Sequence, residues 1–143
     1  MNPIIKYYTI ASLIYFMLGA GLGLSMAIYP PSINYLLFAH VHFLLLGFIA
    51  MMIYSVAYHV LPRFSGFNLY SAMLVTIQFY LANAGLLGMA AIWIIYKNAP
   101  VGALPVTLLS FFSILEFLSI LIFVFNNIMT LSGKGGKNPV QNI

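Results

Sequence analysis

The sequence of 143 residues contains no cysteine. This absence excludes disulfide bonds and thiolate metal ligands. It also excludes covalent c-type haem attachment and iron–sulfur clusters bound through cysteine. A metal or cofactor would have to be held by other side chains, of which neutral imidazole is the commonest metal ligand.

Charged residues are almost as scarce, at 4% of the chain, whereas hydrophobic residues make up 64%. A soluble domain carries about 25% charged residues, so this chain cannot cover a water-exposed surface. The composition predicts an integral membrane protein in contact with the lipid bilayer. The basic residues behind the net charge of +4 are scattered along the chain, which does not indicate a nucleic-acid-binding surface.

Four segments are long and apolar enough to cross a bilayer as helices, which takes about 20 residues each. They are Ile4–Tyr29, Asn34–Leu61, Asn68–Tyr96 and Val101–Leu131. Helix breakers separate them, namely Pro30 with Pro31, Pro62 with Ser65 and Gly66, and Asn98 with Pro100. Because such short connections make neighbouring helices antiparallel, we expect an all-α, up-down four-helix membrane bundle over residues 1–131. Residues 132–143 are expected to form a flexible tail.

The basic residues predict the orientation of this bundle. Four of them lie on one side, namely Lys6, Arg63, Lys134 and Lys137, and only Lys97 lies on the other. The positive-inside rule then places both termini in the cytoplasm of a prokaryotic cell, with the bundle in the inner membrane. The first span is longer than a signal-peptide core and no small-residue cleavage site follows it, so we expect it to be retained.

Small and polar residues indicate where helices meet. Gly19 with Gly23, and Ala84 with Gly88, have the small-xxx-small spacing that allows close backbone approach in lipid, either within the bundle or in an oligomer. Four polar residues of the third span are expected to form hydrogen bonds between helices, namely Ser71, Thr76, Gln78 and Asn83. The only acidic residue, Glu116, falls near the middle of the fourth span. It is expected to be protonated or paired, and to relay protons, support a ligating histidine or hold helices together.

Two of the three histidines, His40 and His42, lie two residues apart in an apolar run. An imidazole among lipid tails is costly and usually functional, so we expect either or both to bind iron. Helical residues advance by about 100° each, so the two rings point to nearly opposite faces and cannot readily share one metal. His59 lies 17 residues beyond His42, roughly 25 Å along the axis. It would therefore serve a second metal site or lie at the interface.

On a straight helix, each histidine shares its face with a different set of residues. The face of His40 carries Leu44, Gly47, Met51, Tyr54 and Tyr58. Gly47 would leave room there for a flat macrocycle, with Met51 and Tyr54 beside it. The face of His42 carries residues typical of packing, namely Phe38, Leu46, Ile49, Ile53 and Val56.

The second span also resembles a known family. From His40 the sequence reads His-Val-His-Phe-Leu-Leu-Leu-Gly-Phe, and it later continues as Val-Ala-Tyr-His-Val-Leu-Pro-Arg up to Arg63. This stretch resembles the second transmembrane helix of subunit I of the haem–copper oxidases. The likeness is greatest to the cbb3-type and nitric oxide reductase branch, and it covers about residues 34–92. In that family a histidine near the outer end of this helix ligates the low-spin haem. His40 matches the family spacing somewhat better, and His42 stays open.

The resemblance also implies what is missing. The second low-spin haem ligand and the copper ligands of the family come from later helices, which this chain lacks. The resemblance therefore implies a haem-binding half-site and not a complete oxidase or reductase. Another copy of the chain or a different subunit could supply the second axial histidine.

The sequence thus predicts a membrane protein that binds haem b, with one or more haems per oligomer, and acts in electron transfer. A homo-oligomer, most simply a dimer, is expected, with a redox partner protein or a quinone. The alternatives are a haem protein that binds or senses NO, O2 or CO, and a cofactor-free accessory subunit. A quinone-reactive enzyme using Tyr54, Tyr58 and Glu116 is a further alternative.

Overall fold

The computed structural model describes residues 3–96 and 102–137, and these residues are predominantly helical. The elements are α1 (Pro3–Ile28), the 3-10 turn η1 (Pro30–Ser32), α2 (Ile33–His42), η2 (Phe43–Ala50), α3 (Met51–Ser65), α4 (Ala72–Tyr96) and α5 (Ala103–Leu131). Within the described residues, four segments have the length and composition of membrane spans: Pro3–Ile28, Pro30–Ser65, Ala72–Tyr96 and Ala103–Leu131. The predicted helical membrane bundle is confirmed.

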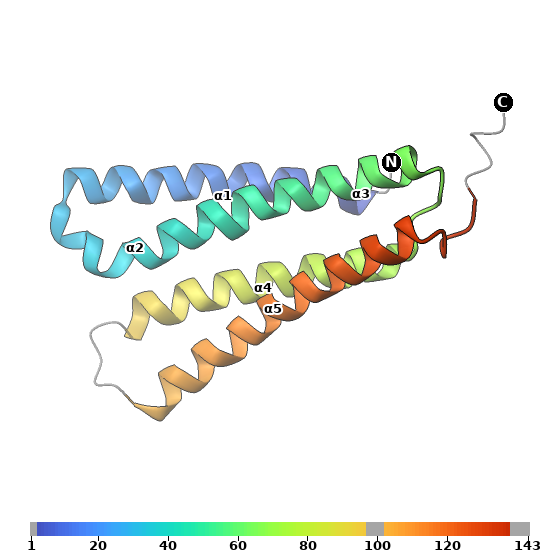
Figure 1. Ribbon diagram of the computed structural model, residues 1–143. Helices are drawn as coiled ribbons and strands as arrows, with labels where there is room; N and C mark the ends of the chain where they lie inside the picture. The colour runs from blue at the N-terminus through green and yellow to red at the C-terminus, as the bar shows by residue number, and fades with distance from the viewer. Residues whose placement is uncertain (1–2, 97–101, 138–143) are drawn as a thin grey trace.

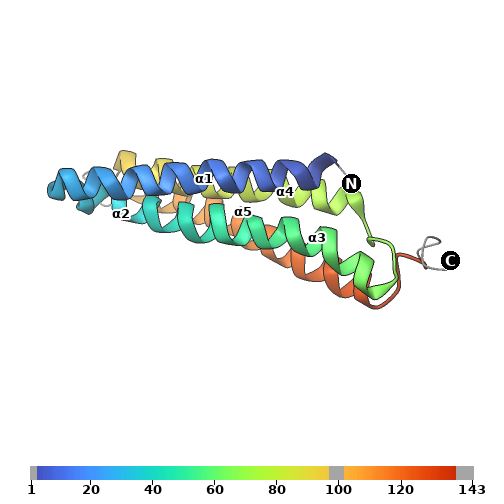
Figure 2. The same cartoon turned by 90° about the horizontal axis from the view of Figure 1, so that it is seen from above.

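The four spans alternate in direction and form two antiparallel pairs (Figure 1). One pair is α1 with the continuous second span, and the other is α4 with α5. The pairs meet where α2 contacts α4 and where α3 contacts α5, and Figure 2 shows them stacked. The start of α1, the end of α3, the start of α4 and the end of α5 lie together. We call this end of the bundle the basic end, because it carries Lys6, Arg63, Lys134 and Lys137.

The second span is not a uniform α-helix. Between α2 and α3, η2 is a π-helical stretch, with hydrogen bonds to the fifth residue back instead of the fourth. The residues before and after such a stretch do not follow one 3.6-residue repeat. The helical faces assigned above on a straight helix are therefore wrong across Phe43–Ala50.

Two predicted span boundaries are also wrong. Pro62 lies inside α3, which continues to Ser65 and ends at Gly66, where φ is +74°. A proline removes only one helical hydrogen bond, whereas the left-handed glycine redirects the chain. The third span begins at Ala72 instead of Asn68. The Ser71 side chain accepts a hydrogen bond from the Leu74 backbone N–H at 3.3 Å and so caps α4.

An aromatic and polar core holds the pairs together. Tyr8 contacts the rings of Tyr54, Tyr58 and Phe79, with centroid separations of 4.9 to 6.2 Å. The Tyr8 hydroxyl donates to the Val75 carbonyl at 3.0 Å. The Tyr8 side chain of α1 therefore makes four contacts, two with α3 and two with α4.

The predicted interhelical hydrogen bonds are confirmed for two of the four side chains. Tyr15 donates to Asn83 at 2.8 Å, and Tyr58 donates to Gln78. Ser71 contacts α5 through its backbone N–H, which donates to the Asn126 side chain at 3.1 Å, whereas its side chain caps α4. The Thr76 hydroxyl donates to the Ala72 carbonyl of its own helix at 3.1 Å.

Close approach of α4 and α5 depends on Gly85 and Gly88. A Cβ at Gly85 would lie 2.8 Å from the Glu116 backbone nitrogen and 2.9 Å from the Phe112 carbonyl oxygen. Gly88 meets α5 as its spacing suggested, whereas Ala84 is exposed and Gly85 makes the second contact within the bundle. A role of Ala84 in an oligomer contact stays a prediction.

The tail turns back onto the bundle directly after α5. The Asn68 backbone N–H donates to the Gly136 carbonyl at 2.9 Å. Gly133 and Gly136 adopt φ values of +74° and +79°, which favour glycine. Flexibility over residues 138–143 stays a prediction, because these residues lie outside the described ones.

Candidate functional site

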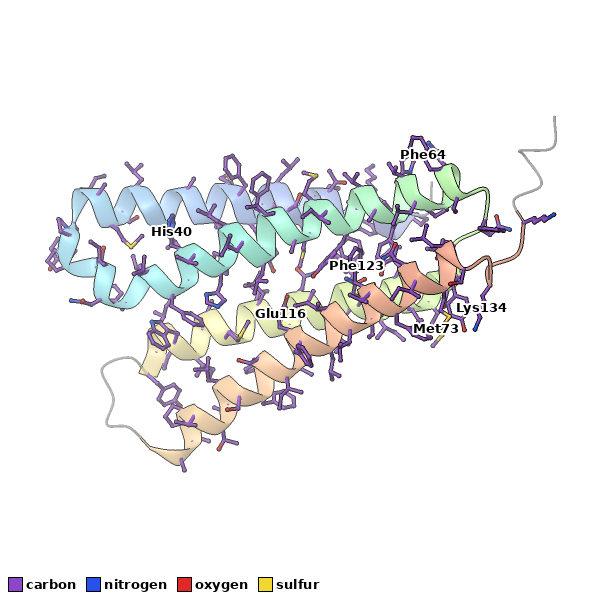
Figure 3. All side chains as sticks on the ribbon, in the orientation of Figure 1. His40, Phe64, Met73, Glu116, Phe123 and Lys134 are labelled. Carbon is purple, nitrogen blue, oxygen red and sulfur yellow. The ribbon has the colours of Figure 1, made fainter. Side chains whose placement is uncertain are left out.

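His40 contacts the neighbouring helix α1. Its Nδ1 lies 2.7 Å from the Gly19 carbonyl oxygen. The ring packs so closely on Gly23 that a Cβ there would lie 2.9 Å from the imidazole Cε1. Figure 3 shows His40 between the two ribbons. The Gly19–Gly23 pair therefore accommodates an imidazole and Leu44, and both are side chains of the second span.

His42 is held within its own helix. Its Nδ1 lies 2.8 Å from the Phe38 carbonyl oxygen, one turn back. Its ring stacks on the Phe38 ring, with 3.9 Å between the ring centroids and an interplanar angle of 26°. The Phe38 ring in turn stacks on the Trp93 ring of α4, with a centroid distance of 4.6 Å and an interplanar angle of 16°. Three rings thus form one continuous stack from α2 to α4.

A groove of about 410 Å³ lies beside this stack. Small-molecule pockets in proteins usually span about 300 to 1,000 Å³. The residues that line the groove beside His42 are Ile33, Asn34, Leu37, Phe38, Val41, His42 and Trp93. Ile33, Leu37 and Val41 are 36 to 49% exposed, so the rim opens sideways toward the bilayer. Apolar side chains form most of the walls, and Asn34, His42 and the indole of Trp93 contribute polar groups.

The hydrogen bonds determine the tautomer of both histidines. A carbonyl oxygen only accepts, so each Nδ1 must carry the proton and donate it. In the neutral ring, Nε2 then carries the lone pair. Metal-ligating histidines commonly have this arrangement, with the far nitrogen donating to a backbone carbonyl. The rings differ in position, because His42 lines a groove whereas His40 packs between two helices.

The structure separates the other predicted site residues from the groove. Gly47 is buried, and a Cβ there would lie 2.5 Å from Cγ of Tyr15 and 3.0 Å from Leu86. The space beside Gly47 is therefore filled by packing. Met51 and Tyr54 are 1% and 5% exposed and belong to the core. None of these three residues lines the groove beside His42.

The remaining polar candidates lie apart as well. His59 is half-buried in α3, roughly 25 Å along the helix from His42. Glu116 is 5% exposed, and its Oε2 is buried without a hydrogen-bond partner. Within residues 3–96 and 102–137, no three His, Cys, Asp or Glu side chains gather into a metal-binding group. A metal held by these side chains alone would therefore have fewer than three such ligands.

Sequence reasoning missed Asn34 and Trp93, and it assigned Phe38 to packing alone. Trp93 is the single tryptophan of the chain and lies in the last turns of α4. Antiparallel packing brings that end of α4 beside the start of the second span. The sequence did contain a signal for the depth of Trp93, because tryptophan is enriched at membrane interfaces. The contact itself depends on the rotation of α4, which no local pattern encodes.

The chain was compared with protein-family models, with curated protein sequences and with solved structures. None of these comparisons found a match. The likeness to subunit I of the haem–copper oxidases therefore rests on the residues of the second span quoted above.

Proposed function

We propose that this chain is a membrane-embedded b-type haem protein that resembles the N-terminal part of haem–copper oxidase subunit I. His42 is the favoured axial ligand. The observation that carries the proposal is the anchored His42 ring, whose Nδ1 is held by the Phe38 carbonyl at 2.8 Å beside an apolar groove. His40 is the second choice, because its ring is packed against Gly19 and Gly23.

The residues of the groove fit a flat, apolar group of this kind. Phe38 holds the imidazole both by its carbonyl and by ring stacking, so little rotational freedom is left to lose on binding. The exposed rim of Ile33, Leu37 and Val41 admits a broad ligand from the side. When bound, haem would supply one-electron transfer, tuned by its axial ligand and its burial.

One histidine leaves the coordination of the iron incomplete. A second copy of the chain, related by a two-fold axis, would supply an equivalent His42. Electron transfer between this dimer and a redox partner protein or a quinone follows as the proposed role. The excess of basic residues at one end supports a prokaryotic inner membrane with cytoplasmic termini.

An optical spectrum of the purified full chain, expressed with adequate haem, tests the proposal. We expect a Soret band that is lost in His42→Ala and retained in His40→Ala. Circular dichroism would establish that both variants remain helical. A colourless, iron-free wild-type preparation would contradict haem binding, and loss of the band only in His40→Ala would reassign the ligand.

Two observations favour alternatives. A single histidine in the groove would leave one iron position open for NO, O2 or CO, so carbon monoxide would shift the reduced spectrum strongly. The His40 hydrogen bond to Gly19 ties α2 to α1 without any ligand, as in a cofactor-free accessory subunit. That role predicts a stable, colourless protein with no bound metal.

A further inference from the structure

The basic end of the bundle carries exposed lysines and no acidic side chain among the described residues. These lysines are Lys6, Lys134 and Lys137. The only acidic residue of the chain is Glu116. It is buried in the middle of α5, about 22 Å along the axis from the end of that helix. The charge that neutralises the lysines must therefore come from outside the chain's side chains.

The tail holds two of these lysines at fixed places. The Lys134 backbone N–H donates to the Met129 carbonyl at 3.1 Å, which continues the last turn of α5. The Asn68 side chain donates to the Lys137 carbonyl at 3.2 Å, and Lys137 also pairs with Phe67 as an isolated β-bridge. The backbone of Lys134 is thus held at the end of α5, and that of Lys137 is held against the loop before α4.

Exposed apolar side chains surround the same end. Phe64 is 86% exposed and Met73 is 73% exposed, and Figure 3 shows both at the end where Lys134 lies. Tyr70 is 39% exposed nearby in the sequence. Aromatic side chains of membrane proteins concentrate at the headgroup level. Their presence here places the lysines at the depth of lipid phosphates.

We propose that the basic end binds the headgroups of anionic phospholipids, and that Lys134 and Lys137 on the folded tail make the main contacts. Charge complementarity selects this partner, because the described part of this end has several exposed lysines and no acidic side chain. A lysine near an anionic membrane surface strengthens binding about fivefold. The proposal is independent of haem, since the groove lies at the opposite end of the bundle.

The test uses the full chain in phosphatidylcholine nanodiscs that contain a minor share of phosphatidylglycerol. The phosphatidylglycerol retained by the protein is measured by native mass spectrometry. We expect Lys134→Gln to weaken retention about fivefold, and added salt to weaken it in the wild type. Lys97→Gln removes one charge after α4, at the other side in the sequence, and should leave retention unchanged.

A third variant separates the position of the charges from their number. Asn68→Ala keeps every lysine but removes the hydrogen bond to the Lys137 carbonyl, so it should also weaken retention. Equal effects of Lys134→Gln and Lys97→Gln would overturn the proposal. Displacement of the lipid by an equal concentration of inorganic phosphate would overturn it as well, because it would indicate a site for free anions.

Discussion

His40 and His42 make nearly the same hydrogen bond with different consequences. Each Nδ1 donates to a backbone carbonyl, at 2.7 and 2.8 Å respectively. The acceptor of His40 belongs to α1, so its ring becomes part of a helix–helix contact. The acceptor of His42 lies one turn back in α2, so its ring stays at the groove. The identity of the acceptor thus determines which imidazole lines the groove.

Gly23→Ala tests the packing of His40 against α1. The added methyl group would lie 2.9 Å from the imidazole Cε1, and the hydrogen bond to Gly19 prevents the ring from moving freely. Overpacking of this kind usually costs about 1 to 3 kcal/mol. We expect Gly23→Ala to lower the free energy of unfolding by about that amount, measured by steric trapping in bicelles.

Gly21→Ala is the matched control, because a Cβ there meets nothing within 4 Å. The substitution should stabilise the helix by about 0.5 to 1 kcal/mol, since glycine is a poor helix former. If the two variants had equal stability, the described contact between α1 and His40 would be wrong.

At the scale of elements, the interface between α4 and α5 is a backbone contact at Gly85. A methyl group there would meet the Glu116 nitrogen and the Phe112 carbonyl of α5 at 2.8 and 2.9 Å. Backbone atoms cannot rotate away as a side chain can. Gly85→Ala should therefore separate the helices and destabilise the protein by about 1 to 3 kcal/mol, measured by unfolding in mixed micelles.

Ala84→Leu provides the contrast on the adjacent residue. Ala84 is exposed, so a larger apolar side chain would face lipid and should change stability by less than about 0.5 kcal/mol. A large loss in Ala84→Leu together with a neutral Gly85→Ala would instead support the interface that the spacing of Ala84 and Gly88 suggests.

The second span shows a limit of predicting helical faces from the spacing of residues in the sequence. Its apolar length predicts a helix across the membrane, and the structure has one over Pro30–Ser65. Its faces could not be assigned, because the π-helical stretch Phe43–Ala50 changes the number of residues per turn. Gly47 was predicted to face a macrocycle, and it packs against Tyr15 instead. The spacing of apolar residues does not reveal that a helical turn contains an extra residue.

At the scale of the whole molecule, the orientation of the bundle stays a prediction that single cysteines can test. The chain has no native cysteine, so a membrane-impermeant maleimide would label only an introduced one. We expect Asn34→Cys to be labelled in intact cells and Ser132→Cys to be labelled only after lysis, because basic residues are retained in the cytoplasm. Both positions are exposed, so the reverse pattern would mean the opposite orientation.

The sequence by itself determined the number of spans, their alternation and the small set of ionisable residues within them. The length of the hydrophobic segments, the helix breakers and the scarcity of ionisable groups are local properties of the sequence. They do not depend on how the helices are rotated about their axes. Only the tertiary structure decided that His42 lines a groove with Trp93 while His40 packs on Gly23. It also decided that Gly85 meets α5 and that the tail binds Asn68. These contacts depend on how each helix is rotated about its own axis, which is set by packing against partners distant in the sequence.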